Sequence, residues 1–154
     1  MKKIIGIKRT VTIVMVLAVT CLTVIASEAV NAKAINKDGS YFAYLKTKPN
    51  KKNDAYIKKI KVKAKKIYVN GPIEYENKKG KSKVLKIGKK TFSISSKCKY
   101  FKMNYKENLK WIKSTKGKIL KEIVKIEKVK NTKRFVEFVV KKGKVVKVRY
   151  YYKK

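Results

Sequence analysis

The sequence predicts a β-rich α+β domain: a small antiparallel sheet or a partly open barrel, with an OB-like barrel as one option, one or two short helices and a C-terminal β-hairpin. Short runs in which apolar residues alternate with lysine recur along the chain, and this period of two is typical of strands with one buried face. Turn residues separate the runs, and beyond the first 32 residues helical spacing is confined to residues 104–130.

Three short strands are predicted early in the domain. Apolar residues alternate with lysine over residues 60–65, and the alternation resumes in the other phase over residues 67–69. A turn or a bulge at residues 65–66 would reconcile the two phases. The Asn-Gly-Pro sequence at residues 70–72 then interrupts the pattern, and residues 73–76 form a further strand.

A β-hairpin is predicted over the next part of the chain, with strands at residues 84–87 and 91–95 joined by a turn at residues 88–90. The apolar residues that follow predict another strand over residues 97–103.

Two short helices are predicted next. Asn104 with Glu107 three residues later resembles a capping box, and Gly117 would end this first helix. Residues 118–130 combine a helical stripe of apolar residues with many β-branched residues, so both helix and strand remain open there. The helical stripe favours a helix.

The C-terminal hairpin is the clearest element. Its strands cover residues 134–140 and 145–152, and Gly143 supplies the positive φ that the turn needs. Across these strands, Glu137 would pair with Lys147 or Arg149. One face of the hairpin is predicted to carry Val136, Phe138, Val140, Val146, Val148, Tyr150 and Tyr152.

The first 32 residues have the three parts of a secretory signal peptide: a basic start, an apolar run and a small-residue site. The apolar run at residues 11–25 is shorter than the ~20 residues of a membrane-spanning helix. Cleavage after Ala32 is therefore favoured over an uncleaved anchor, with a site after Ala29 as a second option. We expect a secreted, extracellular or cell-wall-associated protein that meets a membrane only during export or through surface charge.

The rest of the chain is expected to divide into an arm and a domain. Residues 33–55 are polar apart from an aromatic patch at residues 41–45, which predicts a flexible N-terminal arm. Residues 56–154 would form a single β-rich domain. Cys21 lies in the apolar run, so Cys98 would be the only cysteine after cleavage and no intramolecular disulfide is expected.

The positive charge of the chain is extreme. There are 44 Lys and Arg against 9 Asp and Glu, a net charge of +35. Cleavage would remove four basic residues and one acid and leave +32, whereas small domains usually carry a net charge of about 2–8. The leader and the lysine bias resemble those of lysine-rich exported proteins from AT-rich Gram-positive bacteria. An AT-rich genome favours lysine codons, so the lysine content has two explanations: codon bias and selection for polyanion binding.

Catalytic signatures are scarce in the sequence. The chain has no histidine, which removes the commonest general base and metal ligand, and no zinc, dinucleotide or P-loop motif occurs. Glu74 and Glu76 form the only close carboxylate pair and would suit a carboxylate-only hydrolase, but offsetting nearby lysines is the simpler interpretation. We therefore expect a non-enzymatic protein without a metal or cofactor.

Lysine and aromatic residues interleave most densely near the C-terminus. Rings beside cations are how single-stranded nucleic acid is held without sequence preference, although strand propensity alone also favours tyrosine. The candidate anion-binding residues are Arg149, Lys153, Lys154, Lys147 and Lys144. The candidate stacking residues are Tyr150, Tyr151, Tyr152 and Trp111.

Three functions follow from these patterns. The favoured one is binding of an anionic polymer outside the cell, such as teichoic acid, an acidic glycan, anionic lipid or extracellular nucleic acid, with nucleic acid the less favoured ligand. The alternative is a structural or interaction module of the cell envelope whose aromatic patch or edge strand binds a protein partner. The carboxylate-only hydrolase is a remote third. The sequence assigns no oligomeric state.

Overall fold

The computed structural model describes residues 32–49, 54–86, 88–104, 110–128 and 134–152. Residues Lys33–Lys154 form a compact unit of their own. No helix in these described ranges is long and apolar enough to cross a membrane.

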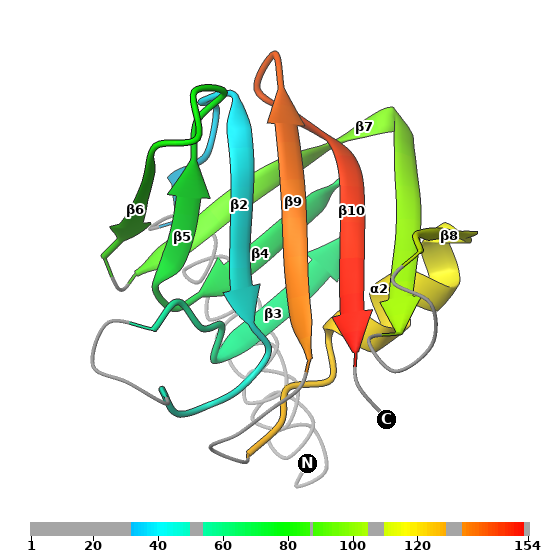
Figure 1. Ribbon diagram of the computed structural model, residues 1–154, viewed down its shortest axis with the longest axis horizontal. Coiled ribbons are helices and arrows are strands. Elements are labelled where there is room, and N and C mark those ends of the chain that lie inside the picture. The colour runs from blue at the N-terminus through cyan, green and yellow to red at the C-terminus, as the bar shows by residue number, and fades with distance from the viewer. Residues whose placement is uncertain (1–31, 50–53, 87, 105–109, 129–133, 153–154) are drawn as a thin grey trace, which may run out of the picture. The chain divides into compact units, whose positions relative to one another are not determined.

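One sheet contains the strands of the described residues (Figure 1). Their order is β3-β4-β7-β10-β9-β2-β5-β6, and β1 and β8 each pair with β7 outside this order. The strands are β1 (Lys33–Ala34), β2 (Gly39–Tyr44), β3 (Lys59–Lys63), β4 (Lys66–Asn70), β5 (Ile73–Glu76), β6 (Ser82–Leu85), β7 (Lys89–Asn104), β8 (Ile112–Ser114), β9 (Phe135–Lys141) and β10 (Lys144–Tyr152). The α-helix described with them, α2, spans Lys116–Ile123.

The prediction of a strand-rich fold is confirmed, but the sheet is mixed and open rather than antiparallel or barrel-like. β1 and β10 run parallel to β7, while pairs such as β9–β10 and β2–β9 are antiparallel. β3 and β6 end the order at opposite edges, so the sheet does not close. Parallel neighbours need a crossover connection, which the chain makes through β8, α2 and β9.

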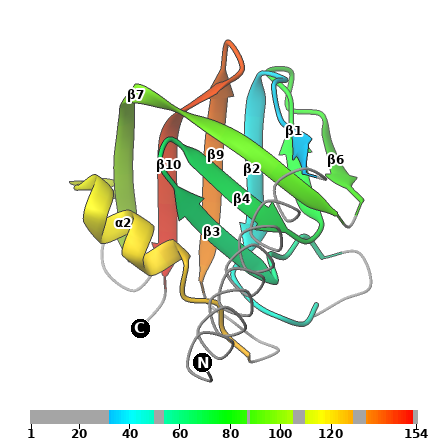
Figure 2. The ribbon, with the colours of Figure 1, turned by 180° about the vertical axis from the view of Figure 1, so that it is seen from behind.

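Strand β7 is 16 residues long and belongs to two layers. Its first half pairs with β4 and its second half with β8. Figure 1 and Figure 2 show β3, β4 and the first half of β7 crossing behind β2, β9 and β10. The stretches at residues 91–95 and 97–103, predicted as separate strands, are therefore parts of one long strand that folds the sheet over its core.

Aromatic rings join the two layers in the core. Phe92 of β7 packs against Tyr41 of β2 and Phe138 of β9, with ring centroids 5.3 and 5.0 Å apart. Each of these three side chains is at most 2% exposed, and burial of large rings is a major source of core stability. We call the side of β2, β9 and β10 that faces this core the inner face and the opposite side the outer face.

The predicted hairpin of residues 84–87 and 91–95 is wrong. β6 pairs with β5, and β7 pairs with β4. The Asn77 side chain stabilises the β5–β6 turn, because its oxygen accepts hydrogen bonds from the Lys79 and Lys81 amides at 2.9 and 3.0 Å. The predicted turn near residues 65–66 does close a hairpin, β3–β4, in which Ala64 has a φ of 51°.

Residues 33–55 do not form the predicted loose arm where the structure describes them. β2 lies inside the sheet, between β9 and β5. Leu45 is fully buried, and so is Lys46, whose ammonium lies 3.2 Å from the carboxylate of Asp54. The compact unit thus begins at Lys33 rather than at residue 56. Residues 50–53 of the predicted arm lie outside the described residues.

Helix α2 confirms the first part of the helix predicted at residues 118–130. Thr115 caps it, because its hydroxyl accepts a hydrogen bond from the Lys118 amide at 3.4 Å. Ile119 and Ile123 form the buried side of the helix.

The other predicted helix, beginning at Asn104, falls mostly on residues 105–109, which lie outside the described residues. Ile112, expected in that helix, begins strand β8 instead. Gly117, expected to end it, lies inside α2.

The C-terminal hairpin is confirmed, with a bulge that changes one of its faces. Gly143 has a φ of 69°, as the turn requires. The pairing of β10 shifts register between Val145 and Lys147, and one extra residue reverses the direction of the side chains before it. Val145 is therefore buried in the core, in the place predicted for Val146.

Candidate functional site

Strand alternation divides the predicted C-terminal cluster between the two faces of the sheet. Tyr150 and Tyr152 lie on the inner face, together with Val148, which is buried. Arg149 and Tyr151 lie on the outer face, opposite residues of β9. The single cluster expected from the sequence is therefore two separate regions.

The inner-face tyrosines border a pocket between α2 and the ends of β7 and β10. Figure 2 shows α2 against this side of the sheet. The pocket has a volume of about 420 Å³, and we call it the α2 pocket. Its lining residues are Lys102, Ser114, Lys118, Ile119, Lys121, Glu122, Tyr150 and Tyr152.

Two stacked rings form one wall of the α2 pocket. The centroids of Tyr150 and Tyr152 lie 5.6 Å apart, with their planes inclined by 13°. Tyr150 is 5% exposed, and burial raises the pKa of its hydroxyl although the hydrogen bond and charge of Arg134 lower it. The Tyr150 hydroxyl therefore stays protonated at neutral pH. Tyr152 is half-buried and presents the more accessible ring.

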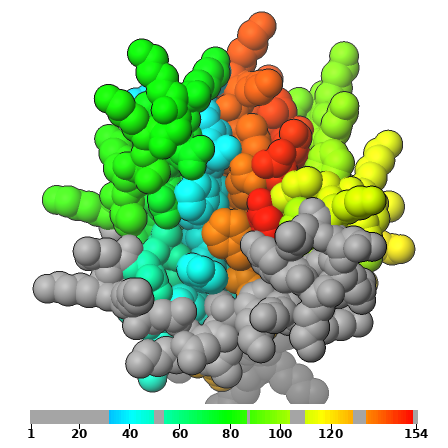
Figure 3. All heavy atoms as spheres, in the orientation of Figure 1, coloured from blue at the N-terminus to red at the C-terminus, as the bar shows by residue number. Residues whose placement is uncertain are grey.

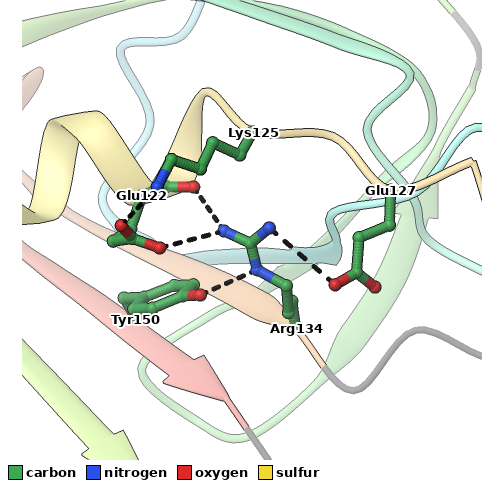
Figure 4. Close-up of polar contacts among 5 residues, drawn as sticks. All are labelled: Glu122, Lys125, Glu127, Arg134 and Tyr150. Atoms are coloured by element: carbon green, nitrogen blue, oxygen red, sulfur yellow. Dashed lines mark hydrogen bonds and ion pairs between the residues drawn. The ribbon is translucent and has the colours of Figure 1, made fainter.

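Arg134 joins this wall to the helix (Figure 4). Its Nε donates to the Tyr150 hydroxyl at 2.7 Å, and its Nη2 donates to the Glu122 carbonyl at 2.6 Å. The Glu122 and Glu127 carboxylates lie 3.4 and 3.8 Å from its guanidinium nitrogens. A planar guanidinium group can donate hydrogen bonds to several acceptors at once, so this nearly buried side chain holds α2 and β10 in a defined arrangement.

The charge of the α2 pocket is positive. Glu122, the carboxylate in its lining, is engaged by Lys125 at 2.8 Å and by Arg134 at 3.4 Å. Lys102, Lys118 and Lys121 therefore leave the pocket with an excess of cations. Cations that converge on a concave site attract anions more strongly than the same charges spread over a convex surface.

A row of aromatic side chains crosses the outer face. Neighbouring ring centroids lie 4.6–6.5 Å apart. Figure 3 looks on to this face and shows the side chains of β2 and β9 next to each other. We call this row the outer aromatic strip; its members are Phe42, Tyr44, Phe135, Tyr151, Trp111 and Phe101.

Glu137 lies beneath the outer aromatic strip, and its carboxylate binds two side chains of β10. Of the two partners predicted for it, Lys147 and Arg149, it pairs across the sheet with Arg149, whose Nη1 lies 3.2 and 3.0 Å from the two carboxylate oxygens. The Tyr151 hydroxyl donates to the same carboxylate at 3.4 Å, and the Arg149 guanidinium lies 5.0 Å from the centroid of Trp111. Arg149 is thus part of a charge-balanced stack rather than a member of an anion site.

The remaining predicted anion-binding residues do not gather in one place. Lys147 lies over the ring of Phe101 at 5.9 Å, at one end of the outer aromatic strip. Lys144 is exposed at the first position of β10. Lys153 and Lys154 lie outside the described residues.

The lysines of the α2 pocket were missed by the sequence reasoning. Two signals could have found them: Lys102 lies two residues after the buried Tyr100, on the same face of its strand, and Lys118 and Lys121 are three residues apart on one side of a helix. What the sequence does not show is that the strand and the helix lie next to each other.

The carboxylate pair considered for catalysis lies together on one strand, away from the α2 pocket. Glu74 and Glu76 lie on the outer face, in register with Phe42 and Ser40 of β2. Cys98 is half-buried, and burial raises the pKa of its thiol, so the reactive thiolate is disfavoured. Within the part of the chain that the structure describes, no three His, Cys, Asp or Glu residues gather as a metal site.

Comparisons with known proteins give no relative: no family model, no curated protein and no solved structure matches the chain. The geometry of the α2 pocket and of the outer aromatic strip therefore carries the functional argument.

Proposed function

We propose that the protein is an exported, non-enzymatic binding protein of the cell envelope or extracellular space, and that it holds an anionic polymer at the α2 pocket. The observation that carries this proposal is the convergence of Lys102, Lys118 and Lys121 on a pocket with a wall of stacked tyrosines. A phosphate or carboxylate group would accept hydrogen bonds from these ammonium groups, and a ring next to it would stack on Tyr152.

A polymer fits the charge distribution better than a small anion. The lysines outside the pocket are spread over most strands, so they would attract further anionic groups along the same chain without recognising their shape. Teichoic acid, acidic glycans and anionic lipid surfaces all present repeated charges of this kind outside a cell. Nucleic acid has the same chemistry and is the less favoured ligand for an exported protein.

Export is supported by the position at which the compact unit begins. Cleavage after Ala32 would release a chain that starts at Lys33, which is the first residue of the compact unit and of strand β1. The cleavage would therefore leave the sheet whole. Mass spectrometry of the secreted protein tests this point, and a chain that retains residues 1–32 would contradict it.

The binding test compares two triple variants with the same change of charge. Lys102→Gln, Lys118→Gln and Lys121→Gln together remove the pocket cations. Lys79→Gln, Lys81→Gln and Lys83→Gln together remove three exposed lysines of the β5–β6 hairpin. The ligands are teichoic acid, an acidic glycan, anionic vesicles and single-stranded DNA, each titrated at about 50 and 200 mM salt.

We expect the pocket variant to lose about 10- to 100-fold in affinity for at least one ligand, and the hairpin variant to lose only a few-fold, because charges that converge on one concave site act together on the same anionic group. Equal losses in the two variants would mean that binding is a property of the lysine coat, and the assignment to the α2 pocket would be wrong.

A further inference from the structure

The outer aromatic strip is unusual for the surface of this protein. A solvent-facing side of a sheet normally carries polar residues, and this chain has 44 Lys and Arg to place there. Its outer face instead carries six neighbouring rings, of which Tyr44 is 38% exposed and the others are half-buried. A row of neighbouring rings on a solvent-facing side of a sheet is therefore a candidate binding site.

The charges around the strip are of both signs, because Lys147 and Arg149 lie over two of its rings and three carboxylates stand on the same face. Glu74 lies beside Phe42 in the pairing of β5 with β2, and Glu76 lies beside Ser40. Glu137 lies one strand further, opposite Phe42. Three of the nine acids of the chain therefore stand on this face, although the chain as a whole is strongly cationic. The strip is thus electrostatically distinct from the α2 pocket.

The rings of the strip are fixed before any ligand binds. Tyr151 makes edge-to-face contacts with Trp111 at 76° and with Phe135 at 70°. The Glu137 carboxylate holds the Tyr151 hydroxyl and the Arg149 guanidinium from below. A surface that is already ordered loses little conformational entropy on binding, and this favours its use for recognition.

The polar groups within the strip favour a ligand rich in hydroxyl groups. Both hydrogen bonds of Arg149 to Glu137 come from Nη1, so Nε and Nη2 are not used in that pair. A hydroxyl can accept from such a donor and donate to a carboxylate such as Glu74. An apolar protein surface would desolvate these groups without replacing the hydrogen bonds that water makes to them, which is costly.

We propose that the outer aromatic strip binds a neutral polysaccharide chain, whose sugar rings pack on the aromatic rings of the strip and whose hydroxyl groups bond to Arg149 and Glu74. This site is independent of the α2 pocket, because the two lie on opposite faces of the sheet and differ in charge. A protein that joins an anionic polymer to a neutral one would cross-link two components of an envelope.

The sole tryptophan of the chain, Trp111, lies in the strip and reports binding by fluorescence. The purified protein is titrated with cellohexaose, chitohexaose and maltohexaose, three neutral oligosaccharides that differ in linkage and substituent. We expect the emission of Trp111 to change and to saturate with at least one of them. Because no net charge is involved, the affinity should differ less than about twofold between 50 and 500 mM salt.

Variants of the strip locate the site. Tyr44→Ala should weaken binding about tenfold, since stacked aromatic side chains are typical binding hot spots, and urea unfolding checks that loss of the ring contact with the Lys46 ammonium, 4.6 Å away, leaves the fold intact. Tyr151→Ala should weaken it at least as much. Tyr68→Ala is the matched control: Tyr68 is a half-buried strand tyrosine on β4, outside the strip, and its loss should leave binding unchanged.

Several outcomes would overturn the proposal. One is a Trp111 emission that does not change with any of the three oligosaccharides at millimolar concentration. Another is an equal loss of oligosaccharide affinity in the Tyr44→Ala and Tyr68→Ala proteins. A third is oligosaccharide binding that disappears as the salt concentration rises. Flat titrations together with strip-dependent binding of a purified protein would identify a protein interface instead. The pocket triple variant should keep its oligosaccharide affinity. The oligosaccharide titrations therefore test the outer aromatic strip, and the anionic ligands test the α2 pocket, independently of each other.

Discussion

The α2 pocket and the outer aromatic strip are built from the same strand, β10, yet their charges differ. Tyr150 and Tyr152 face the pocket, where lysines outnumber carboxylates. Tyr151 and Arg149 face the strip, where Glu137 balances the charge. The comparison shows that the strong positive charge of the chain does not extend evenly over its surface, because alternation along one strand separates two chemically different sites.

Each region depends on one of the two arginines that follow the leader. Arg134 ties Tyr150 to α2, and Arg149 ties Glu137 to Trp111. Lysine supplies the general charge of the chain, whereas arginine occurs where a planar group must contact several partners. Substitutions that affect one region and leave the other intact test how separate the two regions are.

The largest effect is expected from Arg134→Ala. Removing this nearly buried guanidinium leaves the Glu122 carbonyl and the Tyr150 hydroxyl without their partner and should lower the free energy of unfolding by about 3 kcal/mol. The pocket should lose its ligand, while the emission of Trp111 in the folded protein stays unchanged. Urea unfolding and pocket titration measure this, and a variant of wild-type stability would show that Arg134 does not hold α2 in place.

The converse change, Glu137→Gln, should affect the strip alone. The neutral amide replaces a 9% exposed carboxylate that pairs with Arg149, which should cost about 2 kcal/mol. The Trp111 emission should shift because Arg149 is no longer held over the indole ring, and affinity at the α2 pocket should remain within twofold. An unchanged emission spectrum would contradict the coupling of Glu137 to the strip.

Alkaline pH should disrupt both regions together, because they share one core. Burial, with the nearby charges of Tyr75 and Asp38, raises the pKa of Tyr41 from 10.0 to about 12. The folded pKa exceeds the unfolded one, so the stability contributed by neutral Tyr41 is complete below pH 10 and is lost as pH rises through 12. Between pH 8 and 11 the wild type should therefore lose more stability than Tyr41→Phe. If urea unfolding shows that the wild type and Tyr41→Phe lose the same free energy of unfolding over this pH range, Tyr41 is not the cause of the loss.

The smallest effect is expected from Tyr151→Phe. The hydrogen bond from Tyr151 to Glu137 is long, 3.4 Å, and the ring contacts with Trp111 and Phe135 are kept, so the free energy of unfolding should fall by less than about 0.5 kcal/mol. The fold and the pocket should not change, and oligosaccharide affinity should fall only a few-fold. A loss as large as that of Tyr151→Ala would mean that the hydroxyl, rather than the ring, makes the main contact.

Local patterns were sufficient for several elements of the fold. Alternation and turn residues predicted the C-terminal hairpin with the positive φ of Gly143, and they left a turn or a bulge between β3 and β4 and Lys147 or Arg149 as the partner of Glu137, of which the turn and Arg149 are observed. These features depend on residues close together in the chain, and the turn itself sets the strand register. The bulge at Val146 was missed because one extra residue leaves no mark in composition.

Features that depend on distant partners were not predicted. The patch at residues 41–45 is too short to stand out as a central strand, and the burial of β2 comes from β9, which lies about a hundred residues later in the chain. β6 was paired with the wrong neighbour because turn sequences flank it on both sides, and the local pattern does not show that the Asn77 side chain stabilises the turn to β5.

The sequence by itself determined the charge, the lack of histidine, the strand-rich class and the aromatic C-terminal strand. It could not determine which of those aromatic residues meet which charges. The parallel pairing of β7 with β10 brings Lys102 beside Tyr150, and the crossover through α2 brings Lys118 and Lys121 to the same pocket. Only the tertiary structure decides such contacts, because they join segments whose separation along the chain carries no local signal.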